Sequence, residues 1–285
     1  MTDVEAIDIW CNPFLSEAME QFYGSNIQEA AELFGRPDLF RDAVRTSEEF
    51  VALLDEVGVE LAMVPALKYG NAKHRGMEID VPYELIHELC KEYPDRFRGM
   101  AGINPHDGME GVRQLERAVE DYGFVGAHID VYGFDVPLND RRFYPFYAKC
   151  VELDVPVVAQ TGHSAIPSPN KHGKPLLFDD VAIDFPELDI VGAHTGWPWT
   201  EELVALAWVH PNVYIGTTGY APSYWDESLV HFLQAHGRGK VLWGTNYPVV
   251  KHDQSLSGVD DFELSPDVER EFLRETAIDV FDLDL

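Results

Sequence analysis

The sequence predicts an α/β protein folded as one (β/α)₈ barrel. Eight short apolar segments recur along the 285 residues, and segments with helical patterning separate them. Such alternation in a chain of this length is typical of the barrel. The main alternative, an open doubly wound sheet, more often begins with a glycine-rich turn. The sequence contains neither GxGxxG nor a P-loop motif, which disfavours that alternative and a nucleotide site.

The predicted strands are short apolar runs that end in polar residues or glycine. They cover residues 5–10, 60–65, 98–104, 125–131, 155–160, 188–194, 212–216 and 240–244. The predicted helices cover residues 47–58, 83–97, 108–123, 143–154, 179–187 and 265–283. The long stretch 13–46 follows the first strand. We expect it to be an insertion that covers the mouth, either as a lid or as a contact surface, within a single domain over 1–285.

The strongest global feature is the charge. Fifty acidic against 21 basic residues give a formal charge of −29. Such a surface repels nucleic acid and anionic lipid, so we expect neither as a partner. It indicates a halophilic protein whose self-repulsion is screened by a high-salt cytosol, with a merely acidic mesophilic protein as the alternative.

The lack of a recognisable targeting signal and the cysteine usage lead us to expect a cytoplasmic location. The N-terminus, MTDVEA, has neither a basic region nor an apolar signal core, and no apolar run reaches the ~18 residues of a transmembrane helix. Cys11, Cys90 and Cys150 are isolated from one another. This spacing fits a reducing compartment and excludes a cysteine-based zinc site.

Polar and aromatic residues gather at the predicted strand ends, where a barrel places its active site. Because side chains alternate along a strand, Trp10 and Asn12 share one face, and Cys11 points to the other face to pack under the helices. His128 and Asp130 share the interior face of the fourth strand by the same rule. A structural ion pair between these two is the alternative interpretation.

Three further strand ends carry the segments QTGHS, AHTGWPW and GTNYP. They contribute Gln160 and His163, then His194 and Trp197, and finally Asn246. We expect the backbone N–H groups after Thr161 to point at a bound ligand, because the glycine there allows close approach. Coincidence is the alternative, since a lone histidine at a strand end is often only a satisfied polar group.

The run from DVPVVAQTGHS through FPELDIVGAHTGWPW and PNVYIGT to KVLWGTNYP resembles the amidohydrolase-related proteins, which include aminocarboxymuconate-semialdehyde decarboxylase. The order and spacing of these elements match, and IDIW extends the match to the first strand. The resemblance implies a TIM barrel that hydrolyses or non-oxidatively decarboxylates a small carboxylated or aromatic substrate. It also implies a homodimer.

The departures from the family pattern concern the metal ligands. Family members usually offer two histidines from strand 1, one each from strands 5 and 6, and an aspartate from strand 8. The present chain has Trp10, Asn12, Gln160 and Asn246 at four of these positions, and only His194 matches. Zinc typically needs three or four such ligands, so we expect the metal to be displaced. A divalent metal such as zinc, held by other histidines, is the alternative; the candidates are His74, His106, His128, His163 and His172.

The working hypothesis is therefore a metal-independent hydrolase or decarboxylase. His194 and His163 are the predicted general acid or base, and Asp130 orients an imidazole or shares the proton transfer. The predicted substrate-binding residues are Trp10, Asn12, His128, Gln160, Trp197 and Asn246. The alternatives are a metal-dependent hydrolase with non-standard ligands and a catalytically inactive barrel that binds a small molecule.

Overall fold

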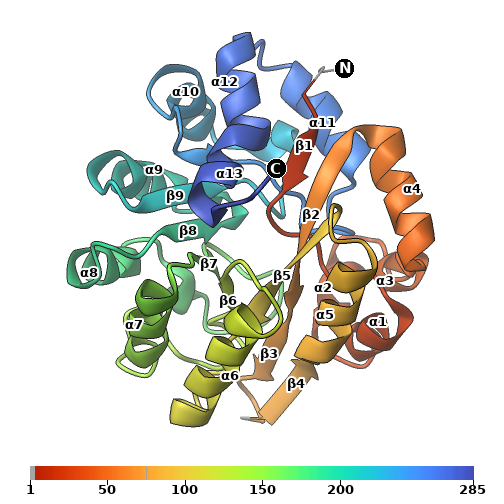
Figure 1. Cartoon of the computed structure of the whole chain (residues 1–285). Helices are drawn as coiled ribbons and strands as arrows, with labels where there is room; N and C mark the ends of the chain where they lie inside the picture. Colours follow the sequence, from red (N-terminus) through yellow and green to blue (C-terminus); the bar gives the residue numbers. More distant parts are fainter. Residues whose placement is uncertain (1–3, 75) are drawn as a thin grey trace.

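A computed structural model describes residues 4–74 and 76–285 of the chain. Eight parallel strands form one sheet in the order β1-β2-β5-β6-β7-β8-β9-β10, with the helices around its outside (Figure 1). The strands are β1 (Ala6–Asp8), β2 (Val59–Ala66), β5 (Phe97–Gly102), β6 (Ala127–Ile129), β7 (Val157–Gln160), β8 (Ile190–Ala193), β9 (Val213–Gly216) and β10 (Val241–Leu242). Each lies where the sequence predicted a strand, so the barrel fold is confirmed.

The predicted helices are also present. They are α4 (Ser47–Val57), α5 (Tyr83–Glu92), α6 (Gly108–Glu120), α7 (Tyr144–Leu153) and α8 (Leu177–Asp184), and the closing helix divides into α12 (Pro266–Arg270), the π-helical turn η4 (Glu271–Glu275) and α13 (Thr276–Phe281). The structure adds elements that we did not predict: the antiparallel hairpin β3 (Lys68–Asn71) and β4 (Gly76–Asp80), and helices α9 (Thr200–Val209), α10 (Glu227–Ala235) and α11 (His252–Asp260). In the described part of the chain, no helix is long and apolar enough to span a membrane.

Residues 13–46 fold into three short helices. These are α1 (Ser16–Tyr23), α2 (Ile27–Leu33) and α3 (Leu39–Asp42). The next helix, α4, begins with a capping box, a pattern that is recognisable in the sequence. The Thr46 hydroxyl accepts from the Glu49 amide at 3.2 Å, and the Glu49 carboxylate accepts from the Thr46 amide at 2.9 Å. Gly58, at φ 77°, ends the helix in the left-handed conformation and starts β2.

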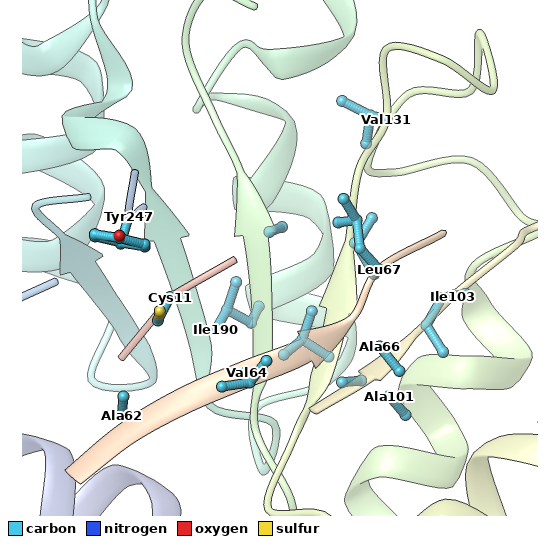
Figure 2. Packing of buried hydrophobic residues seen from close by; sticks show 14 of the residues in the cluster. Cys11, Ala62, Val64, Ala66, Leu67, Ala101, Ile103, Val131, Ile190 and Tyr247 are labelled. Atoms are coloured by element: carbon cyan, nitrogen blue, oxygen red, sulfur yellow. The ribbon is translucent and has the colours of Figure 1, made fainter. Parts of the chain in front are cut away.

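Strand alternation divides the core into two layers. Ala62, Val64 and Ala66 of β2 point outward and pack under the helices (Figure 2). Leu61 and Met63, on the opposite face, point into the barrel and pack with the interior cluster, which residues of α13 also join. Cys11 is fully buried in the outer layer, as the alternation predicted.

The first and last strands close the barrel through their extensions. The Ile9 amide donates to Trp243 O at 3.2 Å, and the Asn246 amide donates to Trp10 O at 2.7 Å. The Asn12 amide then donates to the Tyr247 carbonyl at 3.1 Å. These bonds run past the ends of β1 and β10, so the two segments that carry Trp10, Asn12 and Asn246 are held side by side.

A buried carboxylate locks this closure. Asp8 Oδ1 accepts from the backbone amides of Trp10 and Thr245, both at 3.0 Å. Asp8 Oδ2 accepts from Thr245 Oγ1 at 2.5 Å and from His252 Nε2 at 2.9 Å. Asp8 and His252 are both buried, and a buried carboxylate is stable only with its lone pairs paired in this way.

Replacement of Asp8 by alanine should strongly destabilise the fold. The change leaves four donors around Asp8 without an acceptor, and each buried donor left without a partner costs about 1–3 kcal/mol of unfolding free energy. Urea denaturation measures the loss, with Asp253→Ala on the exposed face of α11 as the matched control. A loss for Asp8→Ala as small as that of the control would contradict the assigned role.

Candidate active site

A pocket of about 540 Å³ opens at the carboxyl ends of the strands. Seven of the nine predicted site residues line it, each from the end of a strand or the loop after it: Trp10, Asn12, Asp130, Gln160, His163, His194 and Asn246. Gly219 and Tyr220, which follow β9, complete the floor. The volume suits a small molecule, and strand ends are where barrels bind their ligands.

The outer wall of the pocket is apolar and comes from residues 13–46. Phe22 of α1, Ile27 and Ala30 of α2, and Phe40 of α3 all line it. Arg36 lies at the exposed edge, where its Nη1 donates to Val249 O at 3.1 Å. Segment 13–46 therefore contributes to the ligand site.

The other two predicted substrate-binding residues, His128 and Trp197, do not line the pocket. His128 is buried under Trp10, whose ring meets it edge-on with 4.2 Å between centroids. Trp197 is 44% exposed and contacts His163 and Tyr220 through its ring, with centroids 5.9 Å apart in both cases. The bulk of the Trp10 side chain keeps His128 from the pocket, and strand alternation alone could not reveal this.

The alternative histidine ligands do not converge. His172 pairs with Asp135 at 2.8 Å, and His106 Nε2 lies 3.4 Å from Phe134 O. Among the five candidates, only His163 lines the pocket in the described part of the chain. They do not form a shared binding site.

A chain of hydrogen bonds spans the pocket floor. Trp10 Nε1 donates to Asn12 Oδ1 at 3.2 Å, and Asn12 Nδ2 donates to Asn246 Oδ1 at 2.6 Å. Asn246 Nδ2 lies 3.1 Å from His194 Nε2, and His194 Nδ1 lies 2.7 Å from Thr218 Oγ1. We call this series the floor relay. Each of its side chains is hydrogen-bonded to the next one in the series.

The backbone at the floor is strained. His194 and Thr195 have φ values of 64° and 56°, and Asn246 has 56°, all in the left-handed region that non-glycine residues rarely adopt. Each such residue costs of order 1–3 kcal/mol and persists only where its surroundings hold it. The His194 amide is held by Thr218 Oγ1 at 3.1 Å, and Gly219 leaves no room for a Cβ, which would lie 2.8 Å from the imidazole.

The titratable groups of the floor are shifted by burial. Burial raises the pKa of the Asp130 carboxyl from its usual 3.8 to about 7, although the amides of Tyr132 and Gly133 donate to one of its oxygens. Burial lowers the pKa of His194 from 6.5 to about 3. It does the same for the pKa of His128, with a smaller contribution from the charge of His194. Both imidazoles are therefore neutral at pH 7, and Asp130 is close to half protonated.

One expectation about the backbone is wrong. The N–H groups after Thr161 do not point at the pocket. The Gly162 amide donates to Gly173 O and the His163 amide to Trp197 O, both at 2.7 Å. Gly162 is required there for another reason: a Cβ would lie 2.2 Å from the Trp197 carbonyl oxygen, so the glycine serves loop packing.

The sequence profile of the amidohydrolase family matches residues 7–283. The chain belongs to the amidohydrolase family. A γ-resorcylate decarboxylase of Polaromonas sp. strain JS666 is 24% identical over 80% of this chain and 85% of its own length. A 2-keto-4-carboxy-3-hexenedioate hydratase of Sphingobium sp. strain SYK-6 is 28% identical over 56% of this chain, and the match spans only 55% of the hydratase.

Solved structures share the fold over nearly the whole chain. An uncharacterised TIM-barrel protein from Bordetella bronchiseptica superimposes with a TM-score of 0.78 at 21% identity, covering 97% of this chain and 98% of that one. A 5-carboxyvanillate decarboxylase from Novosphingobium aromaticivorans with bound manganese gives 0.73 at 17% identity, covering 99% and 97%. The relatives are decarboxylases and a hydratase, which supports the prediction of an enzyme of this general kind.

The floor residues do not fit a divalent metal ion. Trp10 has no lone pair to offer, and the oxygens of Asn12 and Asn246 already accept hydrogen bonds within the floor relay. His194 Nε2 is taken by Asn246. The chemistry of these donors differs from the imidazole and carboxylate sets that bind manganese or zinc.

One other cluster among the described residues brings three ligand types together: Asp8, Cys11 and His252, with ligand atoms within 4.8 Å of one another. Both oxygens of Asp8 are already used in the closure of the barrel. Burial raises the pKa of the Cys11 thiol well above its usual range, so it offers no thiolate. This cluster is structural.

Two residues that shape the site are absent from the predicted site residues. Thr218 holds His194 from the end of β9, and the Thr-Thr-Gly sequence there is the signal that could have identified it. Arg36 is the only lysine or arginine among the described lining residues. It comes from an irregular segment between α2 and α3, where no periodic pattern could point to it.

Replacement of Asp130 by asparagine should stabilise the protein at high pH and not at low pH. The folded wild type holds the Asp130 proton up to its pKa of about 7, whereas the unfolded chain releases it near 3.8, so wild-type stability falls as pH rises between these values. The shift corresponds to up to about 4 kcal/mol, present in full above pH 7. Urea denaturation between pH 4 and 8 measures the difference. Asp253→Asn is the control, and an equal pH trend in both variants would contradict the raised pKa.

Proposed function

We propose that this chain is a metal-independent, non-oxidative decarboxylase of a small carboxylated aromatic substrate. Asp130 carries the proposal, as the only carboxyl group among the described lining residues. Its pKa of about 7 keeps a large share of it protonated at neutral pH. A neutral acid in an apolar pocket can receive a substrate carboxylate without charge repulsion and donate a proton to it.

The proposed reaction uses this proton directly. The bond between the ring carbon and its carboxylate breaks, CO₂ leaves, and the bonding electron pair stays on the ring carbon. That carbon takes the proton of Asp130, which ends the turnover as a carboxylate. His163 lines the same pocket, and its ring carries two nitrogens that can accept and donate, so it is the residue placed to pass a proton from solvent back to the Asp130 carboxylate.

The remaining floor residues bind and orient the substrate. The amides of Gln160 and Asn246 face the pocket and can donate to substrate oxygens, each worth roughly 3–4 kcal/mol when well placed against developing charge. Trp10 offers a flat apolar surface for an aromatic ring. His194, which we expected to be catalytic, is a positioning residue in this proposal, because both of its ring nitrogens are already hydrogen-bonded.

The family relatives support the reaction class and the floor residues support its metal independence. Relatives named as decarboxylases match most of the chain. In this chain four of the five positions at which the resemblance implies metal ligands are paired with one another in the floor relay: Trp10, Asn12, Asn246 and His194. The substrate carboxylate would then be held by amide donors at the floor instead of a metal ion, with Arg36 as the only lysine or arginine among the described lining residues.

Activity should depend on the protonated form of Asp130. We expect kcat/KM to be level below the Asp130 pKa of about 7 and to fall about tenfold per pH step above it, since the acid form disappears as Asp130 ionises. Asp130→Asn should lower kcat/KM by about 10²–10⁴-fold, the usual contribution of a general acid. CO₂ release from γ-resorcylate and 5-carboxyvanillate, compounds named for relatives, measures both effects. An Asp130→Asn variant with wild-type turnover would contradict the role.

Metal removal should leave the activity unchanged. Protein purified in high salt without a metal-affinity tag should contain no stoichiometric metal by elemental analysis, and a chelator should not reduce CO₂ release. Stoichiometric metal together with loss of activity in chelator would instead establish the metal-dependent alternative. Tight binding of these acids with no turnover would establish a binding barrel.

A further inference from the structure

The floor relay contains one group whose hydrogen-bonding role has no alternative. An indole N–H can only donate, whereas an asparagine amide can be turned either way and an imidazole can carry its proton on either nitrogen. Trp10 Nε1 therefore compels Asn12 to present its oxygen, at 3.2 Å. The Asn12 nitrogen then faces Asn246 and must donate, at 2.6 Å.

The same constraint passes on to His194. Because Asn246 accepts through Oδ1, its Nδ2 is the atom that faces His194 Nε2 at 3.1 Å. An amide nitrogen donates, so Nε2 must be the unprotonated nitrogen of the neutral ring. The proton then sits on Nδ1 and is donated to Thr218 Oγ1 at 2.7 Å.

Thr218, at the end of the floor relay, provides an independent check on the tautomer of His194. Its Oγ1 also receives the backbone amide of His194 at 3.1 Å. A hydroxyl oxygen has two lone pairs, so it can accept from both the amide and the Nδ1 proton. The reverse ring tautomer would put two donors, Nε2–H and Asn246 Nδ2, against each other.

The relay leaves one donor for a ligand. Asn12 Nδ2 uses its hydrogens on the side-chain and backbone oxygens of Asn246, at 2.6 and 3.4 Å. Asn246 Nδ2 uses one hydrogen on His194, and its second has no partner among the residues that the structure describes. Asn246 lines the pocket, so this second hydrogen is available to a bound molecule.

We propose that Trp10 is a positioning residue that sets the Nδ1–H tautomer of His194 through Asn12 and Asn246, and so makes the pocket floor a hydrogen-bond donor for an acceptor oxygen of the ligand. The ligand class is a carbonyl or carboxylate compound. The proposal rests on hydrogen bonds alone and does not depend on the proton chemistry of Asp130.

Nitrogen-15 NMR of the histidine rings tests the tautomer directly, because protonated and unprotonated ring nitrogens have distinct shifts. The His194 signals are assigned by their loss in His194→Gln. In the wild type at pH 8 we expect a protonated Nδ1 and an unprotonated Nε2. Trp10→Phe keeps an aromatic ring and removes the donor, so both amides can turn and His194 should become a mixture of tautomers.

Asn12→Asp reverses the relay and keeps the proposal testable if Trp10→Phe fails to fold. The ionised carboxylate that this change introduces can only accept, so Asn246 turns its nitrogen toward it and its oxygen toward His194, which should move the proton to Nε2. Trp243→Phe is the matched control, because it removes a buried indole donor that serves Ser255 outside the relay. A wild-type Nε2–H tautomer, or a tautomer unchanged in both relay variants, would overturn the proposal.

A pair of probes tests the donor at the floor. Acetophenone offers an acceptor oxygen, and α-methylstyrene has the same shape without one. The side-chain amide of Asn246 should shift on addition of acetophenone and not of α-methylstyrene. The ratio of the two affinities should fall about 2–10-fold in Trp10→Phe, the value of one hydrogen bond. An equal response of Asn246 to both probes would refute the donor role.

Discussion

The structure depends on the carboxylate of Asp8. It ties the end of β1 to the segment after β10 through Trp10 and Thr245, and His252 of α11 completes its partners. The two halves of the pocket floor come from positions 234 residues apart along the chain, so their alignment requires a rigid closure. Asp8 is fully buried, and its two carboxylate oxygens accept hydrogen bonds from Trp10, Thr245 and His252. These bonds form only when β1 and the segment after β10 are aligned in this register.

The floor relay follows from a second constraint, the cost of burying unpaired polar groups. A barrel that loses its metal ligands one at a time would leave amides and imidazoles without partners. Here Trp10, Asn12 and Asn246, at positions where the resemblance implies such ligands, are hydrogen-bonded to one another. This mutual pairing explains how non-ligand side chains can coexist at the bottom of a pocket, and why the strained left-handed conformations of His194 and Asn246 are retained.

The sequence was sufficient for the fold and for the position of the pocket, because strand period and strand order decide which residues reach the mouth. Asp130 and Gln160 were placed correctly by these rules. The rules carry no information about side-chain volume, so they did not show that Trp10 would cover His128. The same rules do not show which donors and acceptors meet between distant strands. The hydrogen bonds of both ring nitrogens of His194 were therefore found only in the structure.

In the proposed reaction, these features together place the reactive proton on Asp130. In a site built around a cation, the ion supplies the positive charge that attracts a carboxylate. This pocket has His194, which is neutral at pH 7, amide donors, Arg36 at its exposed edge and one acid whose charge is suppressed by burial. In this proposal a carboxylate binds at the floor while Asp130 is protonated, since two ionised carboxylates in an apolar site repel strongly. Binding and proton donation would therefore require the same protonation state, so substrate affinity and turnover become coupled through a single group.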